Sequence, residues 1–302
     1  MKTLKAIILL TAILIALPCS SQKVVKPALQ KNTPQKNIGL QLYSLRGEIS
    51  RNSENIDEII GKTAKMGYKY VETANYYNGK FYGLAPEEFK AKLAANGLFA
   101  LSSHAGQSLP KDISKTDWDK IWAWWDQAIA DHKAAGMKFI ITAAMNVPET
   151  LEDLLAYCDY YNKIGEKCNA AGLKFGYHNH NFEFDKKYPD KTVMYDYMVA
   201  NTDPDKVFFE LDVYWTVMGK NSPVEIFKKY PGRFLVLHIK DDKELGESGM
   251  VGFDAIFKHI ASSGAKYLIV EVEKYNLPVF ESVQVSLDYL NNAAFVNADY
   301  SK

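Results

Sequence analysis

The chain has 302 residues, with 36 Lys and Arg against 36 Asp and Glu, so its formal net charge at pH 7 is zero. A protein whose main partner is nucleic acid needs a cationic excess to neutralise phosphates, so the charge balance argues against that class. Hydrophobic residues make up 47% and charged residues 24% of the sequence, an ordinary globular composition that excludes a disordered or polytopic membrane protein.

The first 21 residues have the pattern of a secretory signal peptide. A basic start at Lys2 and Lys5 precedes an apolar run over residues 6–17, which is shorter than the ~20 residues that a membrane span needs. Small residues follow, so we expect cleavage after Ser21, export to the periplasm and no stable membrane span. Lipidation at Cys19 is the less favoured alternative, because Pro18 stands where a bacterial lipobox has a small residue.

Residues 22–36 are polar, contain two prolines and predict a flexible tether, so we place a single folded domain over residues 37–302. Cys158 and Cys168 lie ten residues apart in a predicted helix, which separates them by ~15 Å. A disulfide needs Cα atoms within ~7 Å, so the two cysteines are not expected to pair.

Short β-rich apolar runs alternate with helical patterns along this domain. The runs begin at residues 38, 68, 98, 137, 173, 207, 234 and 267. The helical patterns cover 55–66, 86–95, 118–135, 149–171, 224–230 and 253–262. Glycines such as Gly67, Gly172 and Gly264 stand just ahead of strand patterns, where helix C-caps are expected. This alternation predicts parallel βαβ units, and eight of them predict a (β/α)8 TIM barrel.

Polar residues end most of the apolar runs. They are Gln41, Tyr43, Glu72, His104, His178, His180, Glu210, Asp212, His238, Lys240, Glu271 and Glu273. Active sites of TIM barrels lie at the C-terminal ends of the strands, so these side chains are the candidates for the site.

Strand alternation places Glu210 with Asp212, His238 with Lys240, and Glu271 with Glu273 on shared strand faces. If these faces point inward, carboxylates and imidazoles converge as a ligand set for one divalent metal ion: Mn2+, Zn2+, Co2+ or Fe2+. The alternative is a salt-bridge network around Lys240. We favour the metal, because such a network does not require two histidines.

Four motifs in order carry a family resemblance. They are YHNHNFEF at 177–184, ELDVYW at 210–215, LHIKD at 237–241 and IVEVE at 269–273. Together they resemble the xylose isomerase-like barrel superfamily, in particular its sugar phosphate isomerase/epimerase branch, over residues 37–292.

The resemblance implies one divalent ion held by Glu, Asp, His and Glu from the fifth to eighth strands. The matching residues are His178, Asp212, His238 and Glu271, with His178 departing from the usual glutamate. Epimerases of this family use two glutamates as paired acid and base. Only Glu271 of that pair is present here, and Glu273 is an alternative ligand or a second base.

The resemblance further implies an isomerase or epimerase that acts on a sugar or keto-sugar through a metal-stabilised enediolate. Glu271 or Glu273 would move the proton, and Lys240 would compensate the oxyanion. The residues expected to contact substrate are Glu72, His104, His180 and Trp215.

The expected partner is a small carbohydrate, and neither nucleic acid nor a particular oligomeric state is indicated. Export and the lack of an Arg cluster favour a neutral sugar or 3-keto-glycoside over a sugar phosphate. A metal-dependent lyase or hydratase on 3-keto-glycosides is the close alternative, and a non-catalytic periplasmic sugar-binding barrel is the second.

Overall fold

The computed structural model describes residues 35–51 and 53–302. The predicted signal peptide, Cys19 and most of the predicted tether lie outside these residues. Among the described residues, no helix is long and apolar enough to cross a membrane.

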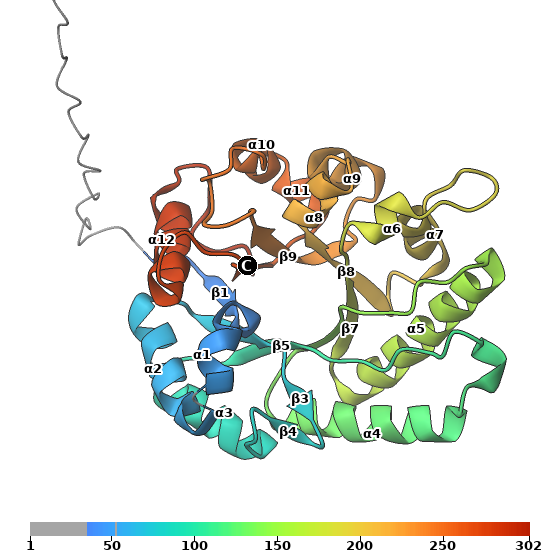
Figure 1. The fold of residues 1–302 in the computed structure, drawn as a ribbon, viewed down its shortest axis with the longest axis horizontal. Coiled ribbons are helices and arrows are strands. Elements are labelled where there is room, and N and C mark those ends of the chain that lie inside the picture. The colour runs from blue at the N-terminus through green and yellow to red at the C-terminus, as the bar shows by residue number, and fades with distance from the viewer. Residues whose placement is uncertain (1–34, 52) are drawn as a thin grey trace, which may run out of the picture. The chain divides into compact units, whose positions relative to one another are not determined.

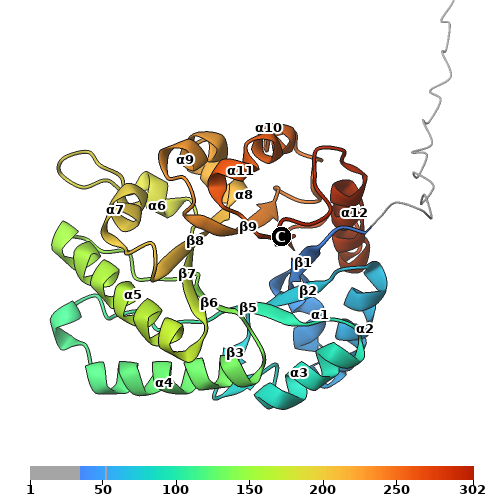
Figure 2. The same cartoon turned by 180° about the vertical axis from the view of Figure 1, so that it is seen from behind.

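Eight parallel strands of the described chain close into a barrel with helices around it (Figures 1 and 2). The strands are β1 (Ile38–Gln41), β2 (Tyr70–Thr73), β5 (Ala100–His104), β6 (Phe139–Thr142), β7 (Lys174–His178), β8 (Val207–Asp212), β9 (Phe234–Lys240) and β10 (Tyr267–Glu271). The barrel closes where β1 pairs with β10. The predicted (β/α)8 TIM barrel is confirmed.

The helices follow the predicted patterns closely. The longer ones are α2 (Ile56–Met66), α3 (Pro86–Ala95), α4 (Trp118–Ala134), α5 (Leu151–Ala171), α7 (Met194–Asn201), α9 (Pro223–Lys229) and α12 (Val279–Asn292). The shorter ones are α1 (Arg46–Arg51), α6 (Phe182–Asp185), α8 (Val213–Met218), α10 (Phe253–Lys258) and α11 (Ile260–Ser263), with 3-10 turns at Leu42–Leu45, Ser53–Asn55 and Ile113–Lys115. The pattern over 253–262 is divided into α10 and α11, and the sequence did not predict α7, α12 or the small hairpin of β3 (Tyr76–Tyr77) and β4 (Lys80–Phe81).

Helix ends and cysteines agree with the sequence. Gly67, Gly172 and Gly264 are C-caps in the left-handed conformation, as expected. Cys158 and Cys168 are buried free thiols.

Lys36, the last residue of the predicted tether, contacts the end of α12. Lys36 is buried, and its ammonium group donates to the carbonyls of Leu290 (2.7 Å) and Ala293 (2.6 Å). The end of a helix leaves carbonyls without partners inside the helix, and the charge of Lys36 satisfies two of them here.

The barrel interior is apolar at the N-terminal ends of the strands. It is filled by a cluster of Tyr70, Leu101, Phe139, Ile141, Phe208, Val236 and Ile269. Two glycines make room for the rings: a Cβ at Gly39 would lie 2.3 Å from the Tyr70 ring, and one at Gly176 would lie 2.5 Å from the Phe208 ring.

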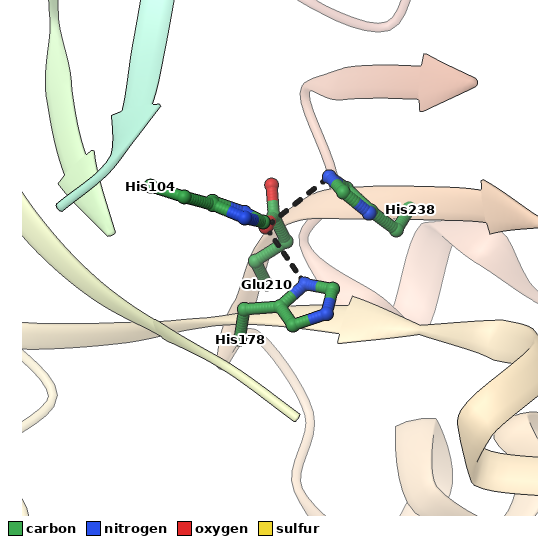
Figure 3. A group of neighbouring side chains, drawn as sticks. All are labelled: His104, His178, Glu210 and His238. Carbon is green, nitrogen blue, oxygen red and sulfur yellow. Dashed lines mark hydrogen bonds and ion pairs between the residues drawn. The ribbon is translucent and has the colours of Figure 1, made fainter. Parts of the chain in front are cut away.

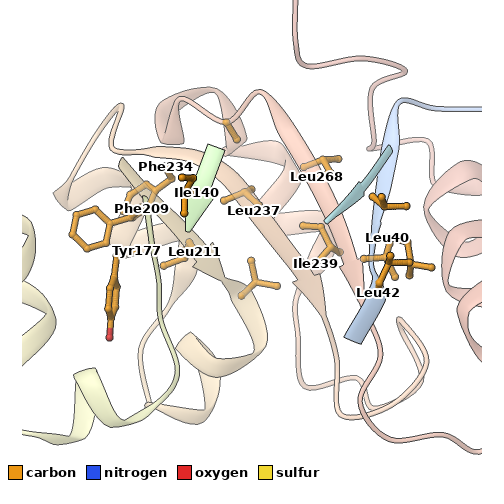
Figure 4. Packing of buried hydrophobic residues seen from close by; sticks show 14 of the residues in the cluster. Leu40, Leu42, Ile140, Tyr177, Phe209, Leu211, Phe234, Leu237, Ile239 and Leu268 are labelled. Atoms are coloured by element: carbon orange, nitrogen blue, oxygen red, sulfur yellow. The ribbon is translucent and has the colours of Figure 1, made fainter. Parts of the chain in front are cut away.

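The opposite strand faces pack against the helices. Leu40, Leu211, Leu237, Ile239 and Leu268 belong to this larger outer cluster (Figure 4). Because side chains alternate along a strand, Phe208, Glu210 and Asp212 share the inner face of β8. The inner wall therefore changes from apolar to ionisable toward the C-terminal ends.

Candidate active site

Five buried or nearly buried ionisable side chains form an inner cluster. It lies inside the barrel, next to the apolar cluster and nearer the C-terminal ends of the strands. Its members are Glu72 of β2, His104 of β5, His178 of β7, Glu210 of β8 and His238 of β9. Figure 3 shows Glu210 between the three histidines of this cluster. Its Oε2 lies 2.8 Å from His104 Nε2, 3.0 Å from His178 Nδ1 and 3.4 Å from His238 Nε2.

Glu72 is held in place by four side chains, one of which is His104, whose Nε2 lies 3.0 Å from Glu72 Oε1. Glu72 Oε1 also accepts a hydrogen bond from Gln41 Nε2 (2.8 Å) and lies 2.7 Å from His238 Nε2, and its Oε2 accepts from Ser102 Oγ (2.5 Å).

Burial opposes a charge on His238, but Glu210, Glu271 and Glu72 outweigh it and raise its pKa, so without an ion this imidazole is protonated. When a metal ion displaces the proton from Nδ1, the proton on Nε2 still donates to Glu72. A carboxylate behind the imidazole fixes the ring nitrogen that faces a metal in many metalloenzymes.

That nitrogen faces a second group, the outer site, formed by Asp212, His238 and Glu271. His238 Nδ1 lies 3.6 Å from Glu271 Oε2 and 3.9 Å from Asp212 Oδ2, which is too long for hydrogen bonds. His238 Nδ1 and Asp212 Oδ2 are buried and have no hydrogen-bond partner within the described residues.

Asp212 is aimed at this point by its own helix. Its Oδ1 caps α8 by accepting from the backbone N–H of Trp215 (2.7 Å), which leaves Oδ2 for the outer site. Buried polar atoms without partners are costly, and a cation between two carboxylates and an imidazole would satisfy them. The outer site therefore fits a divalent metal ion, whereas the shorter distances in the inner cluster are those of hydrogen bonds.

Three of the four predicted ligands thus converge. The fourth, His178, presents Nδ1 to Glu210 in the inner cluster, although its ring centre lies only 4.6 Å from that of His238. Its role as a ligand stays a prediction.

Lys240 lies beside the outer site at the mouth of the barrel. Its ammonium group is 2.8 Å from Glu271 Oε2 and 2.6 Å from Glu273 Oε1. The Trp215 ring centre is 5.1 Å from this ammonium group, and His180 packs against the same indole at 5.7 Å. The salt bridges predicted around Lys240 are therefore present, and they share Glu271 Oε2 with the outer site.

The electrostatic environment separates the charged groups from the neutral ones. Burial and the nearby Glu72 raise the pKa of Glu210 to about 7, and burial raises that of Asp212 to about 6. Burial and the charge of Lys240 lower the pKa of His180 to about 4, so this imidazole is neutral at pH 7. Burial opposes the charge on Lys240, but Glu271 and Asp212 outweigh it and raise its pKa.

Sequence reasoning missed the buried carboxylate of Glu183. It accepts from Tyr177 Oη (2.7 Å) and from the backbone N–H of His180 (2.9 Å), and burial raises its pKa to about 8. It fixes the backbone that carries His180. Glu183 lies in the quoted YHNHNFEF motif, but it follows the strand end by five residues and the strand-end rule passes over it.

Comparisons with known proteins agree with this geometry. The family model of the xylose isomerase-like TIM barrel matches residues 60–293. The crystal structure of a sugar phosphate isomerase/epimerase from Parabacteroides distasonis is 37% identical, covers 87% of this chain and 100% of that chain, and superposes with a TM-score of 0.79.

Curated relatives are more distant. An inosose dehydratase of Lacticaseibacillus casei is 26% identical over 136 residues, 37% of this chain and 44% of the relative. One of Geobacillus kaustophilus is 24% identical over 202 residues, 61% of each chain. The chain thus spans less than two thirds of the length of either relative. The resemblance drawn from the four motifs is confirmed: the chain belongs to the xylose isomerase-like TIM barrel family, as a sugar isomerase/epimerase-like member.

Proposed function

We propose that the protein is an exported, divalent-metal-dependent isomerase or epimerase that acts on a sugar or keto-sugar. The observation that carries the proposal is the outer site, where unpartnered atoms of Asp212 and His238 meet Glu271 beside Lys240. Export is proposed from the N-terminal sequence pattern alone.

Asp212, His238 and Glu271 would hold the ion, and this mixture of carboxylates and imidazole suits Mn2+, Zn2+, Co2+ or Fe2+. When bound, the ion would polarise the substrate carbonyl and the neighbouring hydroxyl.

Glu273 is the better placed of the two glutamates to move a proton. Although burial opposes it, Lys240 and His238 lower the pKa of Glu271 and keep it an anion fit for a ligand. Glu273 lies outside the ligand group, and its side chain is 30% exposed at the mouth. We assign to its carboxylate the removal of the proton next to the substrate carbonyl, with the Lys240 ammonium compensating the charge that develops on the substrate oxygen.

The predicted substrate contacts divide into two groups. His180 and Trp215 line the mouth next to Lys240, and we keep them as contacts for the sugar. His104 has a side chain that is 14% exposed and stays a candidate. Glu72 is fully buried and already bonded to His238, so we assign it to positioning that ligand instead of touching substrate.

A lyase or hydratase is the second candidate, and the similarity to inosose dehydratases favours it. Removal of the same proton, followed by departure of an oxygen substituent from the adjacent carbon, turns the isomerisation into an elimination. Identifying the product as an isomerised or an eliminated sugar shows which of the two reactions the protein catalyses.

The test uses the chain from residue 22 onward, a His238→Ala variant and, as a matched control, His259→Ala at the half-buried C-cap of α10, outside the barrel. Metal content is measured first, and then deuterium uptake from D2O into D-fructose and into a 3-keto-glucoside is followed by NMR. One ion per chain and deuterium uptake, both lost in His238→Ala only, support the proposal.

The other outcomes reassign the protein. An eliminated product identifies a lyase. Binding of either sugar without any deuterium uptake identifies a sugar-binding barrel. Exchange that persists in His238→Ala refutes the metal-dependent scheme.

A further inference from the structure

We propose that a cavity beside the barrel mouth, between the ends of β1 and β2, is a subsite for a flat aromatic ring joined to the reacting sugar. This rests on the proposed function and deepens it, because it names the substrate class as an aryl glycoside.

The cavity has a volume of about 390 Å³. Pockets that bind small molecules start at roughly 300 Å³, so it can take a ring with its substituents. Its walls include the apolar side chains of Leu42, Ile49 and Ala74, the rings of Tyr43 and Tyr82, and the guanidinium group of Arg46. A cavity with apolar and aromatic walls suits a ring better than it suits a chain of hydroxyls.

The cavity is joined to the active site on two sides. The backbone N–H of Tyr43 donates to Gln41 Oε1 (3.0 Å), and Gln41 in turn donates to Glu72. Arg46 Nη2 donates to the backbone carbonyl of Glu273 (2.8 Å), whose carboxylate pairs with Lys240. Two walls of the cavity are therefore hydrogen-bonded to residues that contact the active site.

Tyr43 provides a fixed stacking surface. Its side chain is 43% exposed, and the Arg46 guanidinium lies 4.4 Å from its ring centre. Arg46 is itself held by the carbonyl of Tyr43 and by Tyr275 Oη, each at 3.1 Å. Arg46 thus stacks on a ring and donates to three oxygens of the protein. Because these N–H groups are already used, its guanidinium plane is better placed to contact a flat π-system than to bind a phosphate.

Tyr82 adds a second ring from the β3–β4 hairpin. Its φ is 50°, a left-handed conformation that is uncommon for a residue other than glycine. Its hydroxyl accepts from the backbone N–H of Ala74 (3.2 Å), which ties the hairpin to the end of β2. Backbone strain of this kind concentrates at ligand clamps, so the hairpin has a role in the wall of the cavity.

The test compares two probes, phenyl and methyl β-D-glucopyranoside each oxidised at C3, by calorimetry on the Mn2+-loaded protein. We expect the phenyl glycoside to bind at least tenfold more tightly. Ala74→Phe, which fills the cavity, and Tyr43→Ala, which removes its stacking surface, should each bring the ratio close to one. Tyr77→Ala is the matched control, because this tyrosine of β3 is 74% exposed and lies outside the cavity walls.

Equal affinity of the wild-type protein for the two glycosides overturns the subsite and leaves the proposed function standing. Failure of both glycosides to bind overturns the subsite, and the absence of deuterium uptake into D-fructose as well overturns the proposed function. Tighter binding of glucose 6-phosphate than of the phenyl glycoside, lost in Arg46→Ala, assigns the cavity to a phosphate and overturns the aromatic subsite.

Discussion

Replacing Glu72 by glutamine should weaken metal binding although Glu72 is not a ligand. Its carboxylate is 2.7 Å from His238 Nε2 and fixes the proton on that side of the ring. Gln41 and Ser102 also contact Glu72, so the neutral isostere keeps its place in the barrel.

The size of the effect follows from the loss of one charge. A hydrogen bond to a charged group contributes about 1.5–3 kcal/mol and a neutral one about 0.5–1.5 kcal/mol. Glu72→Gln loses the difference between these two energies, and it loses the carboxylate that fixes the tautomer of His238. We therefore expect the metal affinity to fall roughly 10- to 100-fold, the range found when a carboxylate behind a metal-bound histidine is replaced. This corresponds to about 1.4–2.7 kcal/mol of binding free energy.

The assay is competition for Zn2+ against a fluorescent chelator of known affinity, with thermal unfolding of the metal-free proteins alongside it. Glu183→Gln is the matched control, because Glu183 is equally buried but its hydrogen bonds go to Tyr177 and to the backbone of His180. An affinity of Glu72→Gln within twofold of wild type would refute the positioning role. Equal losses in both variants would show a general effect of replacing a buried carboxyl group.

Three further predictions concern the body of the barrel. Burial lowers the folded-state pKa of His132 to about 4 from 6.5, so the unfolded chain binds the proton more readily. The contribution of His132 to the free energy of unfolding is therefore full above pH 6.5 and falls by about 3 kcal/mol as the pH drops to 4. Urea unfolding of His132→Leu should lack this dependence on pH. Burial raises the pKa of Cys158 and Cys168 to about 12. In the chain from residue 22 onward, neither thiol should therefore react with a disulfide reagent until the protein unfolds. Fast reaction under native conditions would contradict their burial. Gly176→Ala should cost about 1–3 kcal/mol in urea unfolding, because the added methyl would lie 2.5 Å from the Phe208 ring, and an unchanged midpoint would mean that the ring moves freely.

Local patterns were enough to predict the fold and the end of the barrel that holds the outer site. A strand shows only which face a residue occupies, and parallel strands end at the same edge of a barrel. That information places Asp212, His238 and Glu271 among the candidates at one end of three neighbouring strands, and the family resemblance singled them out as ligands.

The inner cluster could not be predicted in the same way. Glu72 and His238 are 166 residues apart and meet across the barrel, and no local pattern records that distance. The ring of His178 turns Nδ1 to Glu210 because a buried carboxylate is available there, which depends on the packing of β7 against β8. Lys36 was missed because its partners are backbone carbonyls at the end of α12, which have no sequence signature.

The contact between His238 and Glu72 also links the outer site to closure of the barrel. The three outer-site residues come from β8, β9 and β10, but the residue that orients His238 comes from β2, which is joined to that side of the barrel through β1 and its pairing with β10. An open sheet between β1 and β10 would separate Glu72 from His238. A divalent ion at the outer site would therefore bind a closed barrel more tightly than an open one.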